Sequence, residues 1–85
     1  MQPVTIYSTQ VCAYCARAKA LLTAKQAPFT EIFIDLEPEK RAEMLRKSGG
    51  RRTVPQIFIG DRHVGGFDDL YALEQKGELD SLLQP

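Results

Sequence analysis

The sequence lacks several features that would place it in a large class of proteins. It contains no tryptophan, one histidine and only two cysteines among 85 residues. Lysine plus arginine number 11, as do aspartate plus glutamate, so the formal net charge is zero and nothing indicates a surface for nucleic acid. No apolar run approaches the roughly 20 residues that a membrane-spanning helix needs. We therefore expect no nucleic-acid partner and no membrane span.

Signals for export and for several domains are also missing. Met1-Gln2-Pro3 leads almost at once into an apolar run and shows no signal-peptide pattern, so the cytoplasm is the expected location. We find no internal repeat, linker or low-complexity segment, and the length suits a single domain over residues 1–85. In a reducing cytosol, a close pair of cysteines is more often catalytic or metal-binding than structural.

The hydrophobic pattern predicts alternating strands and helices. Strands are expected at 3–8, 29–35, 56–59 and from 63, and helices at 13–25, from 36–38 to 47, and from 68 or 69, with a last helical turn near 79–83. The connection between the first two strands is long enough for parallel pairing, whereas the last two form a hairpin. The predicted fold is therefore α/β, with a mixed four-stranded sheet and helices on both faces.

Both cysteines lie where the first strand gives way to a helix, in the C-x-x-C motif Cys12-Ala13-Tyr14-Cys15. Cys15 shares a helix face with Ala18 and Leu22, so Cys15 should point to the core and leave Cys12 at the exposed tip. Free backbone N–H groups and the dipole at a helix N-terminus favour negative charge, and the thiolate is the reactive form of cysteine. This placement predicts thiol–disulfide exchange, in which Cys12 attacks and Cys15 resolves.

Three motifs in this order resemble those of the glutaredoxins, a family with the thioredoxin fold. They are the C-x-x-C motif after the first strand, Thr53-Val54-Pro55 before the third strand, and Gly65-Gly66-Phe67-Asp68-Asp69 before the last long helix. The resemblance covers nearly the whole chain and is strongest to small bacterial dithiol glutaredoxins. It implies glutathione-dependent reduction of protein–glutathione mixed disulfides and of protein disulfides. Glutathione would be the co-substrate, and no cofactor would be tightly bound.

The same resemblance implies roles for individual residues. Cys12 would take the glutathionyl group, and Pro55 would be a cis-proline facing the sulfurs. The Val54 backbone would pair with the cysteinyl part of glutathione, and either Arg51 or Arg52 would serve its glycyl carboxylate. Asp68 could accept a hydrogen bond from the γ-glutamyl ammonium. The predicted glutathione-binding set is Tyr14, Arg52, Thr53, Val54, Pro55, Gly66, Phe67 and Asp68.

Two departures from the family pattern leave alternatives open. Ala13 stands where the motif usually has proline, and Thr9 or Gln10 stands where a lysine often precedes the first cysteine. We expect weaker glutathione binding than is usual in the family. One alternative is a dimer that holds a 2Fe–2S cluster through two Cys12 thiolates and two glutathiones. Another is a redoxin that takes electrons from thioredoxin reductase. Otherwise we expect a monomer.

Two further expectations concern the C-terminal half. His63, the single histidine, falls on the hairpin away from the cysteines and is interpreted as non-catalytic. Asp68 or Asp69 suits an Asx cap at the start of the last long helix.

Overall fold

The central sheet is built from the β-branched and aromatic runs of the sequence. In the computed structural model, which describes residues 1–84, the strands are β1 (Val4–Ser8), β2 (Phe29–Phe33), β3 (Gln56–Ile59) and β4 (Arg62–Gly65). Their order in the sheet is β2-β1-β3-β4. β1 pairs with β2 in parallel, whereas the β1–β3 and β3–β4 pairs are antiparallel. The predicted mixed four-stranded sheet is therefore confirmed.

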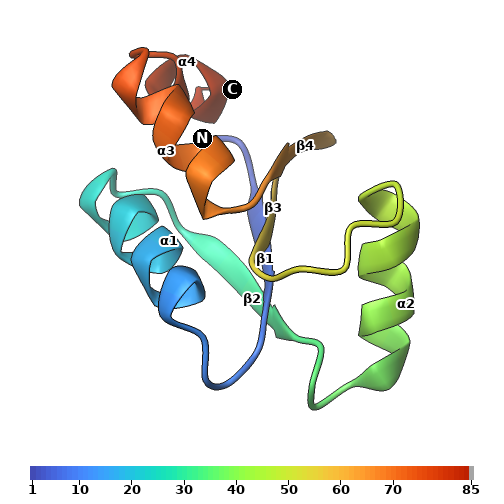
Figure 1. Cartoon of the computed structure of the whole chain (residues 1–85). Helices are drawn as coiled ribbons and strands as arrows, with labels where there is room; N and C mark the ends of the chain where they lie inside the picture. The colour runs from blue at the N-terminus through green and yellow to red at the C-terminus, as the bar shows by residue number, and fades with distance from the viewer. Residues whose placement is uncertain (85) are drawn as a thin grey trace.

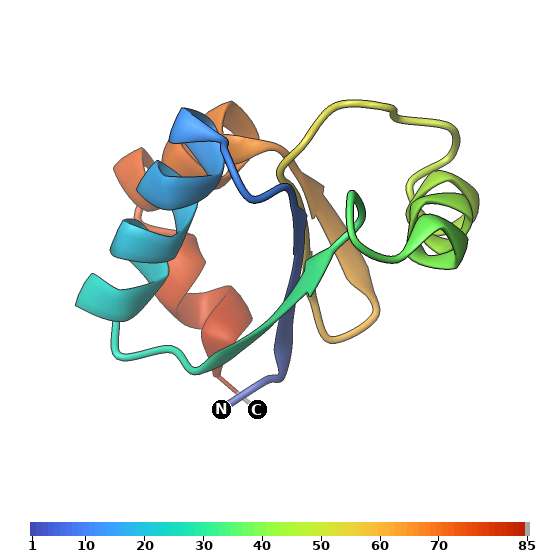
Figure 2. The same cartoon turned by 90° about the horizontal axis from the view of Figure 1, so that it is seen from below.

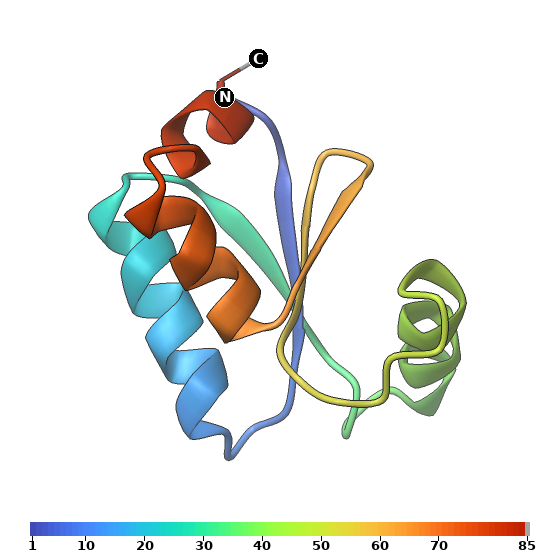
Figure 3. The same ribbon diagram turned by 45° about the horizontal axis from the view of Figure 1, so that its top comes forward.

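Helices cover both faces of this sheet (Figures 1, 2 and 3). They are α1 (Ala13–Ala24), α2 (Pro38–Lys47), α3 (Phe67–Gln75) and α4 (Leu79–Leu83). Figure 3 shows α1, α3 and α4 together on one side, with α2 alone on the other. Within residues 1–84, none of the helices combines the length and the apolar character needed to cross a membrane. The arrangement is the predicted thioredoxin fold, and the last helical turn is a short helix.

Two cores result, because successive strand side chains point to opposite faces. Ile6 on β1 belongs to the larger core, under α1, α3 and α4, whereas its neighbour Tyr7 belongs to the smaller core, under α2. Fully buried members of the larger core include Ala18, Leu22, Ile57, Leu70, Leu79 and Leu83. The smaller one contains Tyr7, Ile34, Met44 and Phe58. The helix that begins at the cysteines thus packs in the same core as α3.

The start of α3 differs from the expected Asx cap. The helix begins at Phe67, so Gly66 occupies the N-cap position and neither Asp68 nor Asp69 does. Asp69 instead lies in the first turn, where its Oδ2 accepts a hydrogen bond from Gly66 N–H at 2.9 Å. The predicted cap was wrong because the carboxylate reaches back to the N-cap residue from inside the helix.

Candidate active site

The two cysteines are joined as a disulfide at the start of α1, with their Cα atoms 5.2 Å apart. Cys15 is only 1% exposed, whereas Cys12 is partly exposed. Cys12 is the N-cap residue of α1, and its sulfur accepts a hydrogen bond from Cys15 N–H at 3.1 Å. The first turn of α1 carries no acidic side chain. The same N–H and the helix dipole would stabilise a thiolate at Cys12 after reduction.

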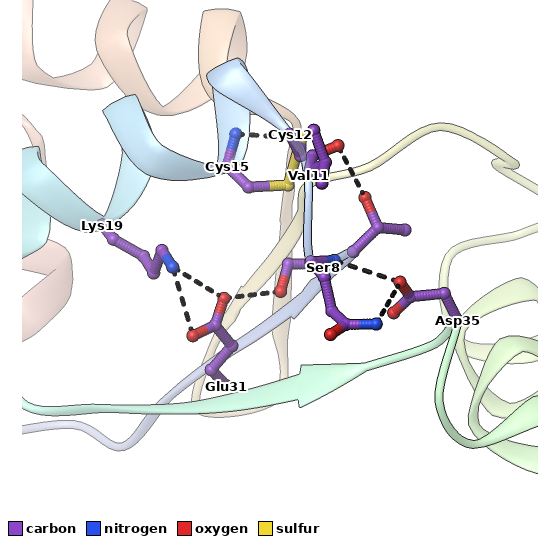
Figure 4. A network of polar contacts seen from close by, with 9 residues as sticks. Ser8, Val11, Cys12, Cys15, Lys19, Glu31 and Asp35 are labelled. Atoms are coloured by element: carbon purple, nitrogen blue, oxygen red, sulfur yellow. Dashed lines mark hydrogen bonds and ion pairs between the residues drawn. A yellow bond between two sulfur atoms is a disulfide. The ribbon is translucent and has the colours of Figure 1, made fainter.

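The loop that leads into Cys12 is held by hydrogen bonds to Asp35, in the turn after β2 (Figure 4). Gln10 donates to Asp35 Oδ2 from its backbone N–H at 3.2 Å and from its side-chain Nε2 at 3.3 Å. The Gln10 N–H holds the pKa of Asp35 below its usual range. From the sequence, Thr9 and Gln10 were notable only because one of them stands where a lysine often precedes the first cysteine in the family pattern. In the structure, Gln10 ties the cysteine loop to the turn between β2 and α2.

A second polar contact lies behind the disulfide and was not predicted from the sequence (Figure 4). The buried Ser8 hydroxyl donates to Glu31 Oε2 at 2.6 Å, and Lys19 Nζ lies 3.0 Å from the same oxygen. Lys19 follows Cys15 by one helical turn, which is the only sequence signal that could have suggested this contact. These contacts tie α1 to the end of β1 and to the middle of β2, and thereby fix the helix that carries the cysteines.

A cavity of about 400 Å³ lies beside the first turn of α1 and is within the size range of small-molecule sites. Its lining residues are Tyr14, Arg51, Thr53, Val54, Pro55, Gly66, Phe67, Asp68 and Asp69. Every member of the predicted glutathione-binding set lines this cavity except Arg52. Arg51 lines it instead, and Asp69 is an addition that the sequence reasoning had assigned only to capping. The Val54–Pro55 peptide bond is cis, as expected.

Charges of both signs surround the cavity. Arg51 Nη2 lies 3.6 Å from Asp69 Oδ2, while Asp68 is exposed at the rim. The N-terminus of α3 adds backbone N–H groups, which suit a carboxylate. The site therefore offers a cation, a helix N-terminus and a free carboxylate. These groups complement a ligand that carries two carboxylates and one ammonium group.

Three aromatic rings extend from this site along α3, of which Tyr14 and Tyr71 are exposed and Phe67 is partly buried. The ring centroids of Tyr14 and Phe67 are 6.2 Å apart, and those of Phe67 and Tyr71 are 5.7 Å apart. Val11, next to Cys12, is 95% exposed. The sequence showed no such cluster of rings, because the rings come from two helices, α1 and α3, that only the fold brings together. The spacing of Phe67 and Tyr71 by one helical turn was the one available signal.

Residues 1–84 do not form a metal site of their own within one chain. No group of three or more histidine, cysteine, aspartate or glutamate side chains in that part of the chain could hold a metal ion. Any cluster bound through Cys12 would therefore need ligands from outside this part of the chain.

Known proteins share both the sequence and the fold of this chain. The family model described as Glutaredoxin matches residues 4–64. A glutaredoxin of Pseudomonas aeruginosa is 59% identical over 83 residues, which cover 98% of each chain. The crystal structure of a buckwheat glutaredoxin–glutathione complex matches with a TM-score of 0.87 and 34% identity, over 96% of this chain and 76% of that one.

A further solved structure, described with the words "Metal Binding of Glutaredoxins", is 63% identical with a TM-score of 0.74. The match covers 98% of this chain and 89% of that one. These matches agree with a cysteine pair at a helix start and a cavity lined by residues of the three expected motifs. The chain accordingly belongs to the glutaredoxin family and is a glutathione-dependent thiol–disulfide oxidoreductase.

Proposed function

We propose that Cys12 is the nucleophile, that Cys15 is the resolving thiol and that glutathione binds in the cavity beside Tyr14. The observation that carries this assignment is the contrast between the two sulfurs. Cys12 is the partly exposed residue, and its sulfur accepts the Cys15 N–H at 3.1 Å, whereas Cys15 is buried. A substrate can approach Cys12 directly, and the helix N-terminus stabilises the charge on its thiolate.

In the monothiol route, the Cys12 thiolate attacks the glutathione sulfur of a protein–glutathione mixed disulfide. A new bond forms between Cys12 and glutathione, and the protein thiolate leaves and takes up a proton. The thiolate of a second glutathione then attacks the bound glutathione sulfur. This step releases glutathione disulfide and restores the Cys12 thiolate.

In the dithiol route, the Cys12 thiolate attacks a protein disulfide and forms a mixed disulfide with the protein. Cys15, once deprotonated, attacks the Cys12 sulfur and displaces the reduced protein. The product is the Cys12–Cys15 disulfide, the state that the structure contains. Two glutathiones then reduce it, so the proposed partners are disulfide-bearing and glutathionylated proteins.

The cavity supports an orientation for glutathione. Arg51 would bind the glycyl carboxylate, the Val54 backbone would pair with the cysteinyl residue, and the N-terminus of α3 at Gly66 and Phe67 would bind the γ-glutamyl carboxylate. Asp68 would accept from the neighbouring ammonium group. Thr53, Pro55 and Tyr14 would form the walls around the glutathione sulfur. The test of the proposal is turnover of a small glutathione mixed disulfide, with glutathione and glutathione reductase supplied. Absence of turnover by the intact protein would contradict it.

Exchanging Arg51 for glutamine should weaken the binding of the glutathione mixed disulfide, whereas the same change at Arg52 should not. Loss of one charge-assisted hydrogen bond predicts a rise in KM of about tenfold for Arg51→Gln and a change within about twofold for Arg52→Gln. Steady-state kinetics with the mixed disulfide gives both values. A larger rise in KM for Arg52→Gln would place the glycyl carboxylate at the other arginine. Thermal unfolding of both variants controls for the lost Arg51–Asp69 pair.

A second candidate function is binding of a 2Fe–2S cluster between two chains, through two Cys12 thiolates and two glutathiones. Two observations favour it: Ala13 occupies the first helical position after Cys12, and a 63% identical relative is described with metal binding. Anaerobic reconstitution with iron, sulfide and glutathione should then give a brown dimer with charge-transfer absorption. We expect Cys15→Ser to retain the colour and Cys12→Ser to lose it. A colourless monomer from the intact protein would rule out this function.

We propose that the protein acts as a monomeric single domain in the cytoplasm when it carries no cluster. Support comes from its chemistry, because glutathione serves as reductant where the thiol pool is kept reduced. One chain also contains both the cysteine pair and the cavity, so the oxidoreductase site is complete without a second copy.

A further inference from the structure

A fully buried amide lies directly behind the cavity. Gln56, the first residue of β3, is 0% exposed. Its Nε2 donates to the main-chain oxygen of Thr53 at 2.9 Å and to Thr53 Oγ1 at 3.2 Å. The side chain therefore bridges back across the turn that carries Val54 and Pro55 into the cavity wall. Leaving a buried polar group without a partner is unfavourable, so this bridge holds the turn in place.

His63 on β4 completes a chain of hydrogen bonds. Its Nε2 lies 2.7 Å from Gln56 Oε1, and an amide oxygen only accepts, so His63 Nε2–H is the donor. The imidazole also stacks on the ring of Phe58, with 4.8 Å between the centroids. Burial is the main cause that lowers the pKa of His63, and the positive charge of Arg51 adds to it. The ring is held as a neutral donor whose direction is fixed by the stacking.

The hydrogen bonds from His63 through Gln56 to Thr53 determine the orientation of one peptide plane. The C=O of Thr53 and the N–H of Val54 belong to the same trans peptide, so they point in opposite directions. Gln56 holds the Thr53 oxygen toward the protein interior. The Val54 N–H therefore points away from that oxygen, and both Thr53 and Val54 line the cavity.

We infer that Gln56 and His63 are positioning residues, which aim the Val54 N–H at the glutathione backbone through the chain His63–Gln56–Thr53. The inference rests on the proposed glutathione site. Neither side chain touches the reacting sulfurs. Their effect should therefore fall on substrate binding more than on the exchange step.

The test uses variants that remove one link each. Gln56→Met keeps the approximate volume and removes the donor to Thr53, and we expect KM for the mixed disulfide to rise about tenfold with kcat changed less than about twofold. His63→Phe keeps an aromatic ring against Phe58 and removes the donor to Gln56, so KM should rise by a smaller factor. His63→Gln restores an N–H donor and should bring KM back toward the original value.

Tyr7→Phe is the matched control. Tyr7 is the cross-strand partner of Gln56 on β1, is equally buried and donates its own hydrogen bond to Glu43, but it has no link to Thr53. Loss of the Tyr7 hydroxyl in Tyr7→Phe should lower the unfolding temperature and leave KM unchanged. If Gln56→Met and His63→Phe behave in the same way as Tyr7→Phe, the inference is overturned and the proposed function stands.

A second measurement does not depend on turnover. The amide 15N–1H dipolar coupling of Val54 reports the orientation of its peptide plane, and it should change in Gln56→Met and in His63→Phe but not in Tyr7→Phe. An unchanged Val54 coupling in both Gln56→Met and His63→Phe would overturn the inference. Failure of the intact protein to turn over the mixed disulfide would instead contradict the proposed function. Because His63→Phe leaves Gln56 itself in place, it decides the matter if Gln56→Met does not fold.

Discussion

Exchanging Cys12 for serine should abolish turnover of a glutathione mixed disulfide, whereas exchanging Cys15 for serine should retain most of it. A serine hydroxyl at the start of α1 is not ionised at neutral pH and cannot carry the glutathionyl group, so we expect a loss of at least about a thousandfold. Cys15 is 1% exposed and takes no part in the monothiol route. The measurement is the initial rate with glutathione and glutathione reductase in excess.

The same two variants separate the second route when the substrate is a protein disulfide. Cys15→Ser should then stop after the first exchange and accumulate a covalent complex between Cys12 and the substrate, which mass spectrometry detects. Far-ultraviolet circular dichroism checks that both variants fold. An equal loss of mixed-disulfide turnover in Cys12→Ser and Cys15→Ser would contradict the assignment of a single nucleophile.

Introducing a methyl group at Gly65 should both destabilise the protein and weaken its glutathione site. Gly65 has φ +118° at the end of β4, and an added Cβ would lie 2.8 Å from Asp69 Cγ, with Oδ2 nearer still. Asp69 would have to move, and its hydrogen bond from Gly66 N–H would be lost. The backbone, cap and packing costs together predict a loss of about 3–5 kcal/mol in Gly65→Ala. KM should also rise, because the start of α3 lines the cavity.

Gly77 provides the matched control for this prediction. It also has positive φ, at +73°, but a Cβ added there would have no heavy atom of residues 1–84 within 4 Å beyond its immediate chain neighbours. Gly77→Ala should therefore cost only about 1 kcal/mol, the cost of the backbone conformation alone, and leave KM unchanged. Urea unfolding measures both free energies. Equal losses in the two variants would show that contact with Asp69 is not what limits residue size at Gly65.

The alternation of short apolar, β-branched runs with longer helical segments was sufficient to predict the mixed sheet, because the connection lengths distinguish a parallel crossover from a hairpin. Most of the cavity lining also followed from the motifs, since those motifs lie at the ends of the predicted elements. The choice between Arg51 and Arg52 did not follow. It depends on the loop after α2, where Arg51 N–H donates to Ser48 Oγ at 3.0 Å. A local contact of this kind has no periodic signal in the sequence.

The interpretation of His63 shows a different limit of the sequence. Its place on the hairpin, away from the cysteines, predicted a non-catalytic residue, which stays a prediction, but gave no sign of its contact with Gln56. Antiparallel pairing of β3 and β4, with a register shift between Ile57 and Phe58, brings its ring to the side chain of Gln56. The start of α3 was missed for a comparable reason, because a glycine at the N-cap position carries no side-chain signal for the carboxylate that reaches it from Asp69.

The unequal division of the core has a consequence for local opening of the molecule. α1 and α3 share the larger core, whereas the smaller core has four buried apolar side chains, of which α2 itself contributes Met44. Fluctuations that detach α2 therefore need less free energy than those that detach α1, and amide protons under α2 should exchange with solvent first. The loop with Arg51 directly follows α2, but Cys12 precedes α1. Sequence changes in α2 can thus tune the retention of glutathione while the reactivity of the thiol is preserved, and the two properties can evolve separately.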